Sequence, residues 1–220
     1  MKYVIMCGGR YESWQRPRHL TRIDGDTLIE RTAKLLKRAG VSNHNIYVST
    51  NNTIIRSYCD AIKIKVLWTE HNDWVVPRPG VSTGDWCDCF YMTGEPTCYL
   101  MGDVVFSPEA IKKIVDTNTE DIEFFASAPP FAPNYIKKYA EPFAFKVENT
   151  GHLRRAKEEC KLLHKKGLFR RPPIAWEFWQ VVKETELNHI NYNNYTVIND
   201  YTCDIDVPAD AEKIEGFMND

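Results

Sequence analysis

The most constraining feature of the sequence is its N-terminal segment, in which an apolar run over residues 3–7 stops at Gly8 and Gly9. β-Branched and apolar side chains in such a run are typical of a strand that is buried on both faces. Two glycines let the backbone turn sharply and present bare N–H groups to an anion. Three arginines follow, and guanidinium groups bind phosphate oxygens in a forked geometry: Arg10, Arg16 and Arg18. The segment predicts a strand that leads into a phosphate-binding loop, although a Gly-Gly pair after a strand is also typical of an ordinary tight turn.

The length and composition of the chain bound its architecture. With 220 residues, 43% of them hydrophobic, the chain can bury one substantial core, and no linker rich in Ser, Gly or Pro divides it. We therefore expect a single domain over residues 1–220. The formal net charge is −2, so the protein as a whole lacks the basic surface that is typical of nucleic-acid binding.

Neither the N-terminal apolar run nor the cysteines indicate an exported or membrane-bound protein. The run covers only residues 3–7, whereas a signal sequence needs a longer apolar region and a bilayer span needs about 20 residues. The seven cysteines are an odd number scattered along the chain, which favours reduced thiols over a disulfide framework. We expect a cytoplasmic protein without a membrane partner.

Helical and strand-like patterns alternate in the first half of the chain. A helix is predicted where apolar residues recur at helical spacing, and a strand where a short apolar run is bounded by turn residues. After the N-terminal strand, the predicted elements are a helix over 27–39, a strand over 46–50, a helix over 53–61, a strand over 64–68, a strand over 98–103 and a helix over 108–115. This alternation predicts an α/β fold whose mostly parallel sheet is covered by helices on both faces.

The second half of the chain has a less regular pattern. Its predicted elements are strands over 122–127 and 142–147, a helix over 151–165, an aromatic helix over 174–182, a strand over 195–199 and a last helix that ends near residue 218. No internal repeat is present in the sequence.

Two acidic positions are candidates for metal binding. Asp103 stands at the end of the predicted strand over 98–103, and ligands of open α/β sheets bind beyond the carboxyl ends of the strands. We expect the N-terminal glycine–arginine loop to hold a triphosphate, and Asp103 would face it. A carboxylate in that position is best explained by a divalent cation between the two negative groups, and Mg²⁺ prefers one or two carboxylates plus phosphate oxygens. Asp206 is the second candidate, although an Asp just before Pro208 is equally typical of a helix N-cap. Asp210 is interpreted as first-turn charge favourable to the helix dipole.

A second glycine-rich turn occupies residues 80–85 and precedes a short aromatic helix. One interpretation is that Gly80, Ser82 and Thr83 contact the base or ribose of a nucleotide. The other is a loop with an ordinary helix N-cap. Composition does not separate the two.

The order of these segments resembles the sugar-phosphate nucleotidyltransferase superfamily. Residues 7–10 (Cys-Gly-Gly-Arg), 17–20 (Pro-Arg-His-Leu) and 23–29 are similar to its N-terminal glycine loop, its Pro-Lys-x-Leu motif and its Gly-x-Pro-Leu-Ile helix entry. Residues 102–106 resemble its metal-binding Gly-Asp motif, and residues 204–210 resemble its terminal Asp-x-Asp-Thr-Pro-Glu-Asp. The motifs stand in the family's order and span nearly the whole chain.

This resemblance implies a Rossmann-like fold of the nucleotide-diphospho-sugar transferase type. It also implies a reaction in which a phosphorylated acceptor attacks the α-phosphate of an NTP, with a nucleotide-binding half over 1–116 and an acceptor-binding half over 117–220. The predicted nucleotide-binding residues are Cys7, Gly8, Gly9, Arg16, Gly80, Ser82 and Thr83, the predicted catalytic residues are Arg10 and Arg18, and the predicted Mg²⁺ ligands are Asp103 and Asp206. In-line attack at phosphorus needs positioning and electrostatic relief more than acid–base chemistry, which agrees with these residue types.

The sequence departs from the family pattern at several positions. The glycine loop is shorter than usual, so the signature arginine is either Arg10 or Arg16. Arg18 replaces the lysine of the Pro-Lys motif, which keeps the charge but changes its reach and hydrogen-bond geometry. Val207 replaces the usual threonine after the second aspartate, and Ala209 replaces the middle acid. These changes are typical of a divergent subgroup and leave open a weak or altered activity.

The acceptor site is predicted from weaker signals in the second half. Lys137, Lys138 and Glu141 lie in a charged stretch, and Arg170 and Arg171 precede the aromatic helix. These cations could bind an anionic head group, and Trp176 could pack over a sugar or a quaternary ammonium. Each has an alternative structural interpretation, because lysines are usually solvated and a Trp at helical spacing usually belongs to the core.

Three functions stay open from the sequence. The first is a Mg²⁺-dependent nucleotidyltransferase that joins an NTP to a phosphorylated sugar or similar small molecule, with CTP favoured by analogy with short members of the family. The second is a glycosyltransferase of the same fold, in which Asp204 and Asp206 would form the metal-binding pair. The third is a non-catalytic nucleotide-binding subunit. We expect no nucleic-acid partner, and a homo-oligomer stays open.

Overall fold

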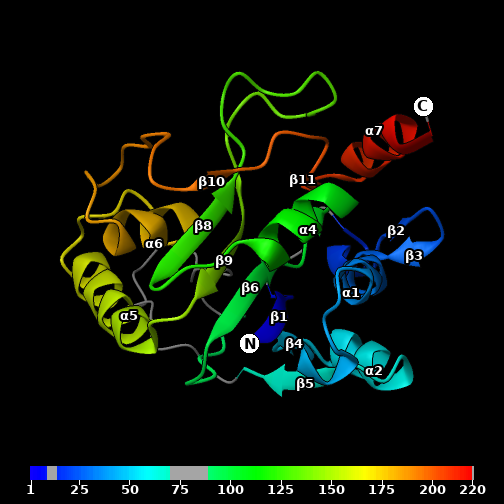
Figure 1. Cartoon of the computed structure of the whole chain (residues 1–220), viewed down its shortest axis with the longest axis horizontal. Helices are drawn as coiled ribbons and strands as arrows, with labels where there is room; N and C mark the ends of the chain where they lie inside the picture. Colours follow the sequence, from blue (N-terminus) through cyan, green and yellow to red (C-terminus); the bar gives the residue numbers. More distant parts are fainter. Residues whose placement is uncertain (9–13, 70–88, 220) are drawn as a thin grey trace.

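A central β-sheet organises the part of the chain that the structure, a computed structural model, describes: residues 1–8, 14–69 and 89–219 (Figure 1). Within these residues the sheet has seven strands in the order β10-β8-β9-β6-β1-β4-β5. They are β1 (Lys2–Met6), β4 (Ile46–Thr50), β5 (Lys65–Trp68), β6 (Thr97–Met101), β8 (Ile122–Ala126), β9 (Pro142–Val147) and β10 (Thr196–Val197). β1 is parallel to β4 and β6, β4 to β5, and β8 to β10, whereas β9 is antiparallel to both of its neighbours. The prediction of a mostly parallel sheet is therefore confirmed.

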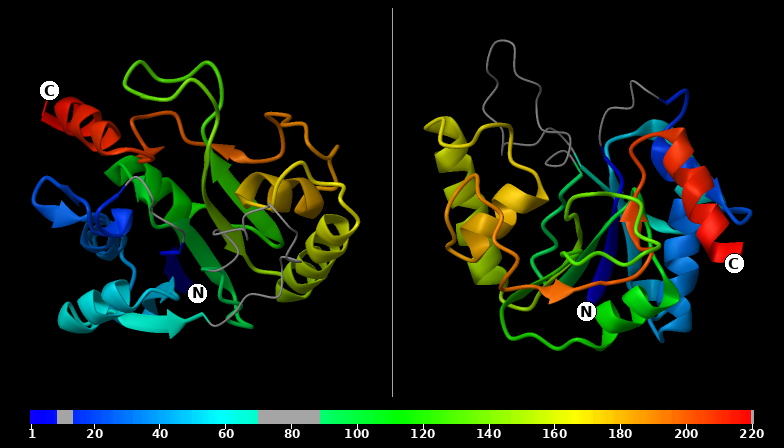
Figure 2. Two further views of the ribbon diagram at one scale, coloured as in Figure 1. Left: turned by 180° about the vertical axis from the view of Figure 1, so that it is seen from behind. Right: turned by 90° about the horizontal axis from the view of Figure 1, so that it is seen from above.

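Helices cover both faces of this sheet, as the sequence predicts (Figure 2). They are α1 (Leu28–Arg38), α2 (Thr53–Ala61), α4 (Pro108–Asp116), α5 (Thr150–Lys165), α6 (Ala175–Val182) and α7 (Pro208–Asn219), with short 3₁₀ helices η1 (Arg18–Leu20) and η2 (Asn43–Asn45). Successive side chains of a strand point to opposite faces. In β9, the ring of Phe145 packs against Phe178 of α6 with centroids 5.4 Å apart, while the Lys146 ammonium donates hydrogen bonds to the carbonyls of Ile114 and Val115 near the end of α4. α6 and α4 therefore lie on opposite faces.

Helix α1 shows how local sequence fixes the ends of an element. The Thr27 hydroxyl accepts a hydrogen bond from the backbone N–H of Glu30 at 3.2 Å, and the Glu30 carboxylate accepts one from the backbone N–H of Thr27 at 3.1 Å. This capping box satisfies two backbone donors at the start of the helix. The helix ends at Arg38, and Ala39 is its C-cap. The predicted span of 27–39 therefore includes one capping residue at each end.

The other predicted elements lie close to the observed ones, and the differences have a physical cause. The predicted strand over 195–199 pairs only at Thr196–Val197. Two short antiparallel pairs are absent from the sequence prediction: β2 (Arg22–Ile23) with β3 (Asp26–Thr27), and β7 (Val104–Val105) with β11 (Cys203–Asp204). A two-residue strand is too short to show the alternation of apolar and polar residues that identifies longer strands.

The pairing of β7 with β11 brings the two acidic segments together. Asp204 is in register with Val104, and the backbone N–H of Ile205 donates a hydrogen bond to the carbonyl of Asp103 at 2.9 Å. The segment that follows β6 thus lies beside the segment that precedes α7, although the two are far apart in sequence.

The core contains a stack of aromatic rings along the sheet. The Tyr99 ring centroid lies 4.8 Å from those of Phe90 and Phe145, which are 5.8 Å apart, and Phe124 stacks on Phe145 at 5.3 Å. The six cysteines in the described part of the chain are free and buried, in agreement with the prediction of reduced thiols. In the same ranges, no helix combines the length and apolar character that a bilayer crossing requires.

Gly102 stands where β6 closely approaches the end of β1. Its backbone N–H donates a hydrogen bond to the carbonyl of Met6 at 2.9 Å, and an added Cβ would overlap that carbonyl and the sulfur of Cys7. We expect Gly102→Ala to lower the free energy of unfolding by about 1–3 kcal/mol, the usual cost of overpacking. Urea unfolding followed by circular dichroism measures this change.

Gly216→Ala in α7 is the matched control for that variant. Outside its own helix, no heavy atom lies within 4 Å of an added Cβ at Gly216. Alanine is favoured over glycine inside a helix by about 0.5–1 kcal/mol, so the control should be at least as stable as the wild type. Equal stability of the two variants would contradict the close approach at Gly102.

Candidate active site

A cavity of about 440 Å³ lies at the edge of the sheet where β1 and β6 end. Because these two strands are parallel, their carboxyl ends meet at one edge, and the antiparallel β9 begins there. The charged side chains that line the cavity are Arg18, Asp103, Glu141, Arg171, Asp204 and Asp206. Ligands of open α/β sheets bind at this edge, which is where the sequence predicts Asp103 to lie.

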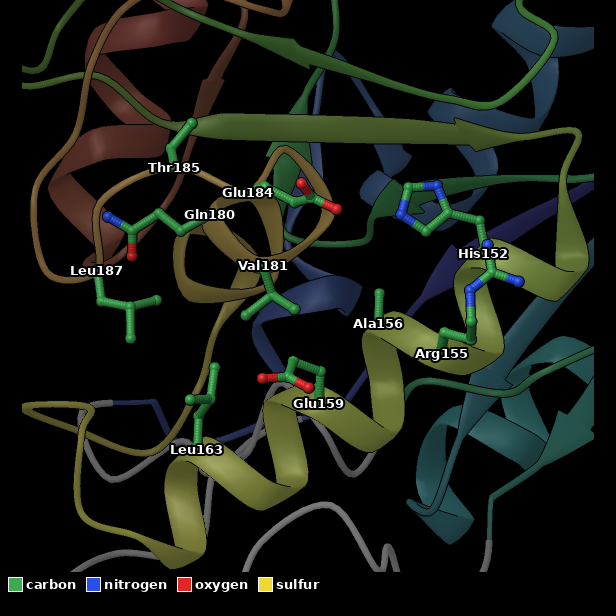
Figure 3. Close-up of a pocket in the computed structure, with 10 residues that line it drawn as sticks. All are labelled: His152, Arg155, Ala156, Glu159, Leu163, Gln180, Val181, Glu184, Thr185 and Leu187. Atoms are coloured by element: carbon green, nitrogen blue, oxygen red, sulfur yellow. The ribbon is translucent and has the colours of Figure 1, made fainter.

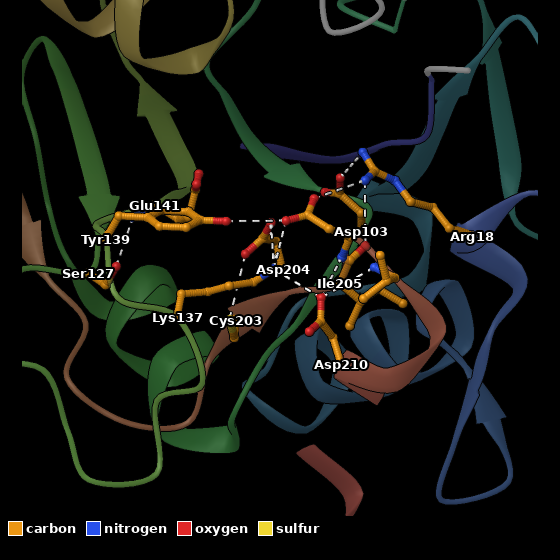
Figure 4. Close-up of polar contacts among 12 residues, drawn as sticks. Arg18, Asp103, Ser127, Lys137, Tyr139, Glu141, Cys203, Asp204, Ile205 and Asp210 are labelled. Atoms are coloured by element: carbon orange, nitrogen blue, oxygen red, sulfur yellow. Dashed lines mark hydrogen bonds and ion pairs between the residues drawn. The ribbon is translucent and has the colours of Figure 1, made fainter. Parts of the chain in front are cut away.

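Arg18 links the two predicted metal ligands, and its position beside Asp103 can be followed in Figure 4. Its guanidinium forms an ion pair with Asp103, and its Nη1 lies 3.5 Å from Oδ1 of Asp206 and 3.5 Å from the carbonyl oxygen of Ile205. Three charged residues from distant parts of the sequence therefore converge at one point. Two carboxylates that share one cation in this way are close enough to share another.

The structure distinguishes the roles of Asp206 and Asp210. The Asp210 carboxylate accepts hydrogen bonds from the backbone N–H groups of Asp206 at 3.0 Å and Val207 at 3.3 Å, so it caps the start of α7. The Asp206 carboxylate instead contacts the cationic side chains of Arg18 and Lys137. The carboxylate that caps α7 is therefore that of Asp210, and the assignment of Asp206 as a metal ligand stays a prediction.

A buried lysine completes this group of charges. Lys137 belongs to the loop between β8 and β9, and its side chain is only 9% exposed. Its ammonium lies 2.7 Å from Oδ2 of Asp206, 3.0 Å from Oδ2 of Asp210 and 3.9 Å from Oδ2 of Asp204. Burial alone would lower the pKa of Lys137, but these carboxylates outweigh burial and raise the pKa above its usual value. The lysine is therefore fully charged.

Two further carboxylates face the cavity. Burial raises the pKa of Glu141 and of Asp204 above the usual range, and the neighbouring carboxylates of Asp206 and Asp103 raise both further. The part of each shift that comes from neighbouring carboxylates reflects repulsion between negative charges at the cavity. A divalent cation bound at the cavity would relieve this repulsion.

The chemistry of the donor set fits Mg²⁺. Asp103 and Asp206 offer carboxylate oxygens beside an open cavity, and Mg²⁺ usually binds one or two carboxylates together with phosphate oxygens and water. Within residues 1–8, 14–69 and 89–219, no three His, Cys, Asp or Glu side chains form a preformed metal cluster. A metal site with two protein carboxylates, in which the oxygens of a bound triphosphate supply further ligands, agrees with both observations.

The comparisons with known proteins agree with this chemistry. A family model described as the MobA-like NTP transferase domain matches residues 3–171. The chain belongs to this family. It is therefore a nucleotidyl-transfer enzyme, and the suspected resemblance to nucleotidyltransferases is confirmed. A search of curated proteins finds no match.

Solved structures show the same fold as this NTP transferase at low sequence identity. The inositol-1-phosphate CTP transferase from T. maritima is 13% identical with a TM-score of 0.56, over 97% of this chain and 94% of its own. A putative glucose-1-phosphate thymidylyltransferase from Bacillus anthracis is 14% identical with a TM-score of 0.56, over 100% and 96%. The CMP:2-keto-3-deoxy-manno-octonic acid synthetase, solved with CTP, is 13% identical with a TM-score of 0.53, over 100% and 99%. The predicted Rossmann-like α/β fold of the nucleotide-diphospho-sugar transferase type is thereby confirmed.

The end of β1 in this NTP transferase is packed too tightly for the Cys7 side chain to reach a nucleotide. The thiol is fully buried, which raises its pKa well above the usual value, and the Cys7 backbone N–H donates a hydrogen bond to the carbonyl of Ser49 at 2.8 Å. The thiol therefore faces the core of the sheet, and the assignment of Cys7 to the nucleotide stays a prediction. Gly8 does line the cavity, and an added Cβ there would overlap the side chain of Cys89.

Several predicted site residues lie outside the described residues or away from the cavity. The first group is Gly9, Arg10, Gly80, Ser82 and Thr83. Arg16 is exposed in the bend before η1 and does not line the cavity. Its assignment to the nucleotide stays a prediction.

One of the three predicted acceptor-binding residues is corrected by its position. Lys138 is exposed and does not line the cavity, so its assignment stays a prediction, as for Arg16. Trp176 is 4% exposed in the core, where its ring packs edge-on against Trp179 and its indole N–H donates a hydrogen bond to the carbonyl of Ala140 at 3.3 Å. Its structural interpretation is the correct one. Glu141 does line the cavity, so its assignment stays a prediction.

The predicted nucleotidyltransferase site leaves out Lys137 and Asp204: Lys137 is named only as a possible contact to an anionic head group, and Asp204 only in the glycosyltransferase alternative. Asp204 has a usable signal, since it stands two residues before Asp206 and a strand places alternate side chains on the same face. Lys137 has none, because it lies beside Lys138 in a loop without periodicity. Only the folded loop shows which of the two lysines turns inward.

A second cavity, of about 540 Å³, lies between α5 and α6 (Figure 3). Its lining mixes charged residues such as His152, Arg155 and Glu159 with the apolar Leu163 and Val181. None of the predicted site residues lines it. The first cavity is the candidate active site because of the charges that converge there, although it is the smaller of the two.

Proposed function

We propose that this NTP transferase joins an NTP, with CTP as the favoured donor, to a phosphorylated sugar or a similar phosphorylated small molecule in a Mg²⁺-dependent reaction that releases pyrophosphate. The observation that carries the proposal is the convergence of Asp103, Arg18 and Asp206 at the cavity beside Gly8. Family membership supports nucleotidyl transfer. The choice of CTP and of a phosphorylated acceptor is supported by fold neighbours that include a CTP transferase for inositol-1-phosphate and a synthetase solved with CTP.

The proposed reaction is an in-line displacement at phosphorus. An oxygen of the acceptor phosphate forms a bond to the α-phosphorus of the NTP, and the bond from that phosphorus to the oxygen bridging to the β-phosphorus breaks. The bridging oxygen keeps the electron pair and leaves with pyrophosphate. No proton transfer is required in this step, so positioned charges are sufficient to promote it.

The residues at the cavity would divide this work. Asp103 and Asp206 would hold Mg²⁺, which when bound neutralises phosphate charge and orients the α-phosphate for attack. Arg18 lies at the same point, so its guanidinium can move from the carboxylates to the phosphate oxygens and stabilise the negative charge that crowds around phosphorus. Gly8 lines the cavity, so a phosphate chain bound there would lie beside the backbone at the end of β1.

The glycosyltransferase alternative is less well supported by these observations. It shares the fold and the acidic pair, but the chain matches an NTP transferase family over most of its length. An arginine between the two acidic segments also suits an NTP, because its triphosphate carries more negative charge than the diphosphate of a nucleotide-sugar.

The proposal of nucleotidyl transfer also includes a cytoplasmic location and a role in making activated sugars.

A pyrophosphate assay tests the proposal. We expect pyrophosphate release only when the protein, Mg²⁺, one preferred NTP and a phosphorylated acceptor are all present. The four common NTPs should be crossed with a panel of sugar phosphates, inositol phosphate and choline phosphate, with EDTA as the metal-free arm. Release of a nucleoside diphosphate from a nucleotide-sugar, without pyrophosphate from any NTP, would instead establish the glycosyltransferase alternative.

A further inference from the structure

We infer that Lys137 is a positioning residue, which holds one oxygen of the Asp206 carboxylate so that the other oxygen faces the cavity. The inference deepens the proposed function and rests on it, because it concerns the orientation of a proposed Mg²⁺ ligand. Lys137 reaches this position from the loop between β8 and β9, far in sequence from the acidic motif.

The two oxygens of Asp206 have different partners. Oδ2 accepts a hydrogen bond from the Lys137 ammonium at 2.7 Å and lies 3.4 Å from the hydroxyl of Tyr139. Oδ1 lies on the other side, 3.5 Å from Nη1 of Arg18, and the same guanidinium is paired with Asp103. One oxygen is therefore held by the loop, while the other faces the point where the two proposed ligands meet.

Lys137 is itself fixed by a rigid partner. Its ammonium also lies 3.0 Å from Oδ2 of Asp210, and that carboxylate is anchored by the backbone N–H groups of Asp206 and Val207. The ammonium therefore bridges the carboxylate that caps α7 and the carboxylate that faces the cavity. This bridge ties the orientation of Asp206 to the helix start.

A hydrogen-bond network closes the loop that carries Lys137. The Ser127 hydroxyl donates a hydrogen bond to the hydroxyl of Tyr135 at 2.8 Å, and Tyr135 donates one to the carbonyl of Tyr139 at 3.0 Å. Ser127 also accepts a hydrogen bond from the backbone N–H of Glu141 at 2.9 Å. Tyr135 is 8% exposed, so the network is largely protected from water. The lysine thus projects from a loop with defined geometry.

A positioning role differs from a stabilising ion pair in what it affects. The Asp206 side chain is 47% exposed, so its ion pair with Lys137 contributes little to stability, whereas the pair of Lys137 with Asp210 is largely buried and contributes more. A free carboxylate on an exposed side chain rotates among rotamers, whereas a metal site needs its ligand oxygens in a fixed direction. Loss of Lys137 should therefore lower stability through Asp210 and weaken cation binding through Asp206, and only the second effect tests positioning.

The sign of the effect separates positioning from simple charge. Loss of a positive charge beside a cation site strengthens cation binding if charge alone matters. Loss of an orienting partner weakens it, typically about 10-fold or more for residues behind a metal ligand. We expect Lys137→Met to raise the Kd for Mn²⁺ about 10-fold, in the direction opposite to the charge effect.

The experiment is a titration of each purified protein with Mn²⁺ alone, with free Mn²⁺ followed by electron paramagnetic resonance. Lys138→Met is the matched control, since that lysine is exposed and does not line the cavity, and its Kd should equal the wild-type value. Lys137→Arg keeps the charge, but its planar head group cannot take the place of a compact ammonium between two carboxylates. We expect Lys137→Arg to raise the Kd about threefold, a partial rescue.

The outcomes separate this inference from the proposed function. Asp206→Asn should weaken Mn²⁺ binding strongly, and wild-type affinity in that variant would overturn the metal assignment itself. If Asp206→Asn weakens binding while Lys137→Met binds Mn²⁺ as tightly as the wild type or more tightly, the positioning role is wrong and the metal assignment stands. Should Lys137→Met fail to fold, Lys137→Arg decides, and an unchanged Kd in that variant overturns the inference.

Discussion

Asp103→Asn should lower kcat/KM for nucleotidyl transfer by about 10³-fold, which corresponds to about 4 kcal/mol of lost transition-state stabilisation. Asparagine keeps the size of the side chain and one oxygen, so the hydrogen bond that its backbone carbonyl accepts from Ile205 should persist. It lacks the negative charge that pairs with Arg18 and that a divalent cation requires. The effect should therefore fall on catalysis and on cation binding, not on the fold.

The measurement for this variant combines steady-state kinetics with thermal unfolding. Asp116→Asn is a matched control, because that carboxylate lies at the exposed end of α4, where it pairs with Lys112. We expect the control to keep wild-type kcat/KM and both variants to unfold within a few degrees of the wild type. Turnover of Asp103→Asn within about 10-fold of the wild type would contradict the metal assignment.

Arg18→Ala should lower kcat/KM by about 10²- to 10³-fold while leaving Mn²⁺ binding intact or tighter. The guanidinium now neutralises Asp103 and Asp206, so its removal exposes both carboxylates to a cation. At the same time the reaction loses the cation that would stabilise charge around phosphorus. Arg18→Lys should fall between alanine and the wild type, because an ammonium keeps the charge without the forked geometry.

The opposite effects on metal binding are the diagnostic feature of this pair of variants. Asp103→Asn should lose turnover and Mn²⁺ affinity together, whereas Arg18→Ala should lose turnover alone. Arg22→Ala is the control. Arg22 stands four residues after Arg18 in the sequence, but it does not line the cavity and donates a hydrogen bond to the carbonyl of Gly25. Weaker Mn²⁺ binding in Arg18→Ala would show that the arginine holds the carboxylates of Asp103 and Asp206 in the positions that bind the cation. That result would contradict the role assigned to Arg18.

The sheet and its helices could be predicted because their sequence patterns are strong. A strand buried on both faces is a continuous apolar run, as in β1, and an amphipathic helix with a capping box has recognisable ends, as in α1. The order of these elements then places Asp103 at the carboxyl edge of the sheet. The short pair β7–β11 could not be predicted, although it is this pair that joins the two acidic segments.

The division of roles between Asp206 and Asp210 could not be decided from spacing. Both stand near the start of a helix, where an aspartate either caps backbone N–H groups or faces outward. The choice depends on the course of the chain from β11 into α7, which leaves the Asp210 carboxylate within reach of two backbone N–H groups. The same limit applies to Lys137 and Lys138, because a loop has no periodicity that shows which side chain turns inward.

Transfer of a nucleotidyl group at Asp103 and Asp206 is tested most directly by following the α-phosphorus of the NTP. The preferred NTP, labelled with ³²P at the α-position, should be incubated with Mg²⁺ and the acceptor, using the wild type and Asp103→Asn in parallel. We predict that the wild type moves the label into a nucleotide-linked product with one unlabelled pyrophosphate per transfer, and that Asp103→Asn stays near background. Label that remains in the NTP with every phosphorylated acceptor, or that moves equally fast in Asp103→Asn, would contradict the proposed function.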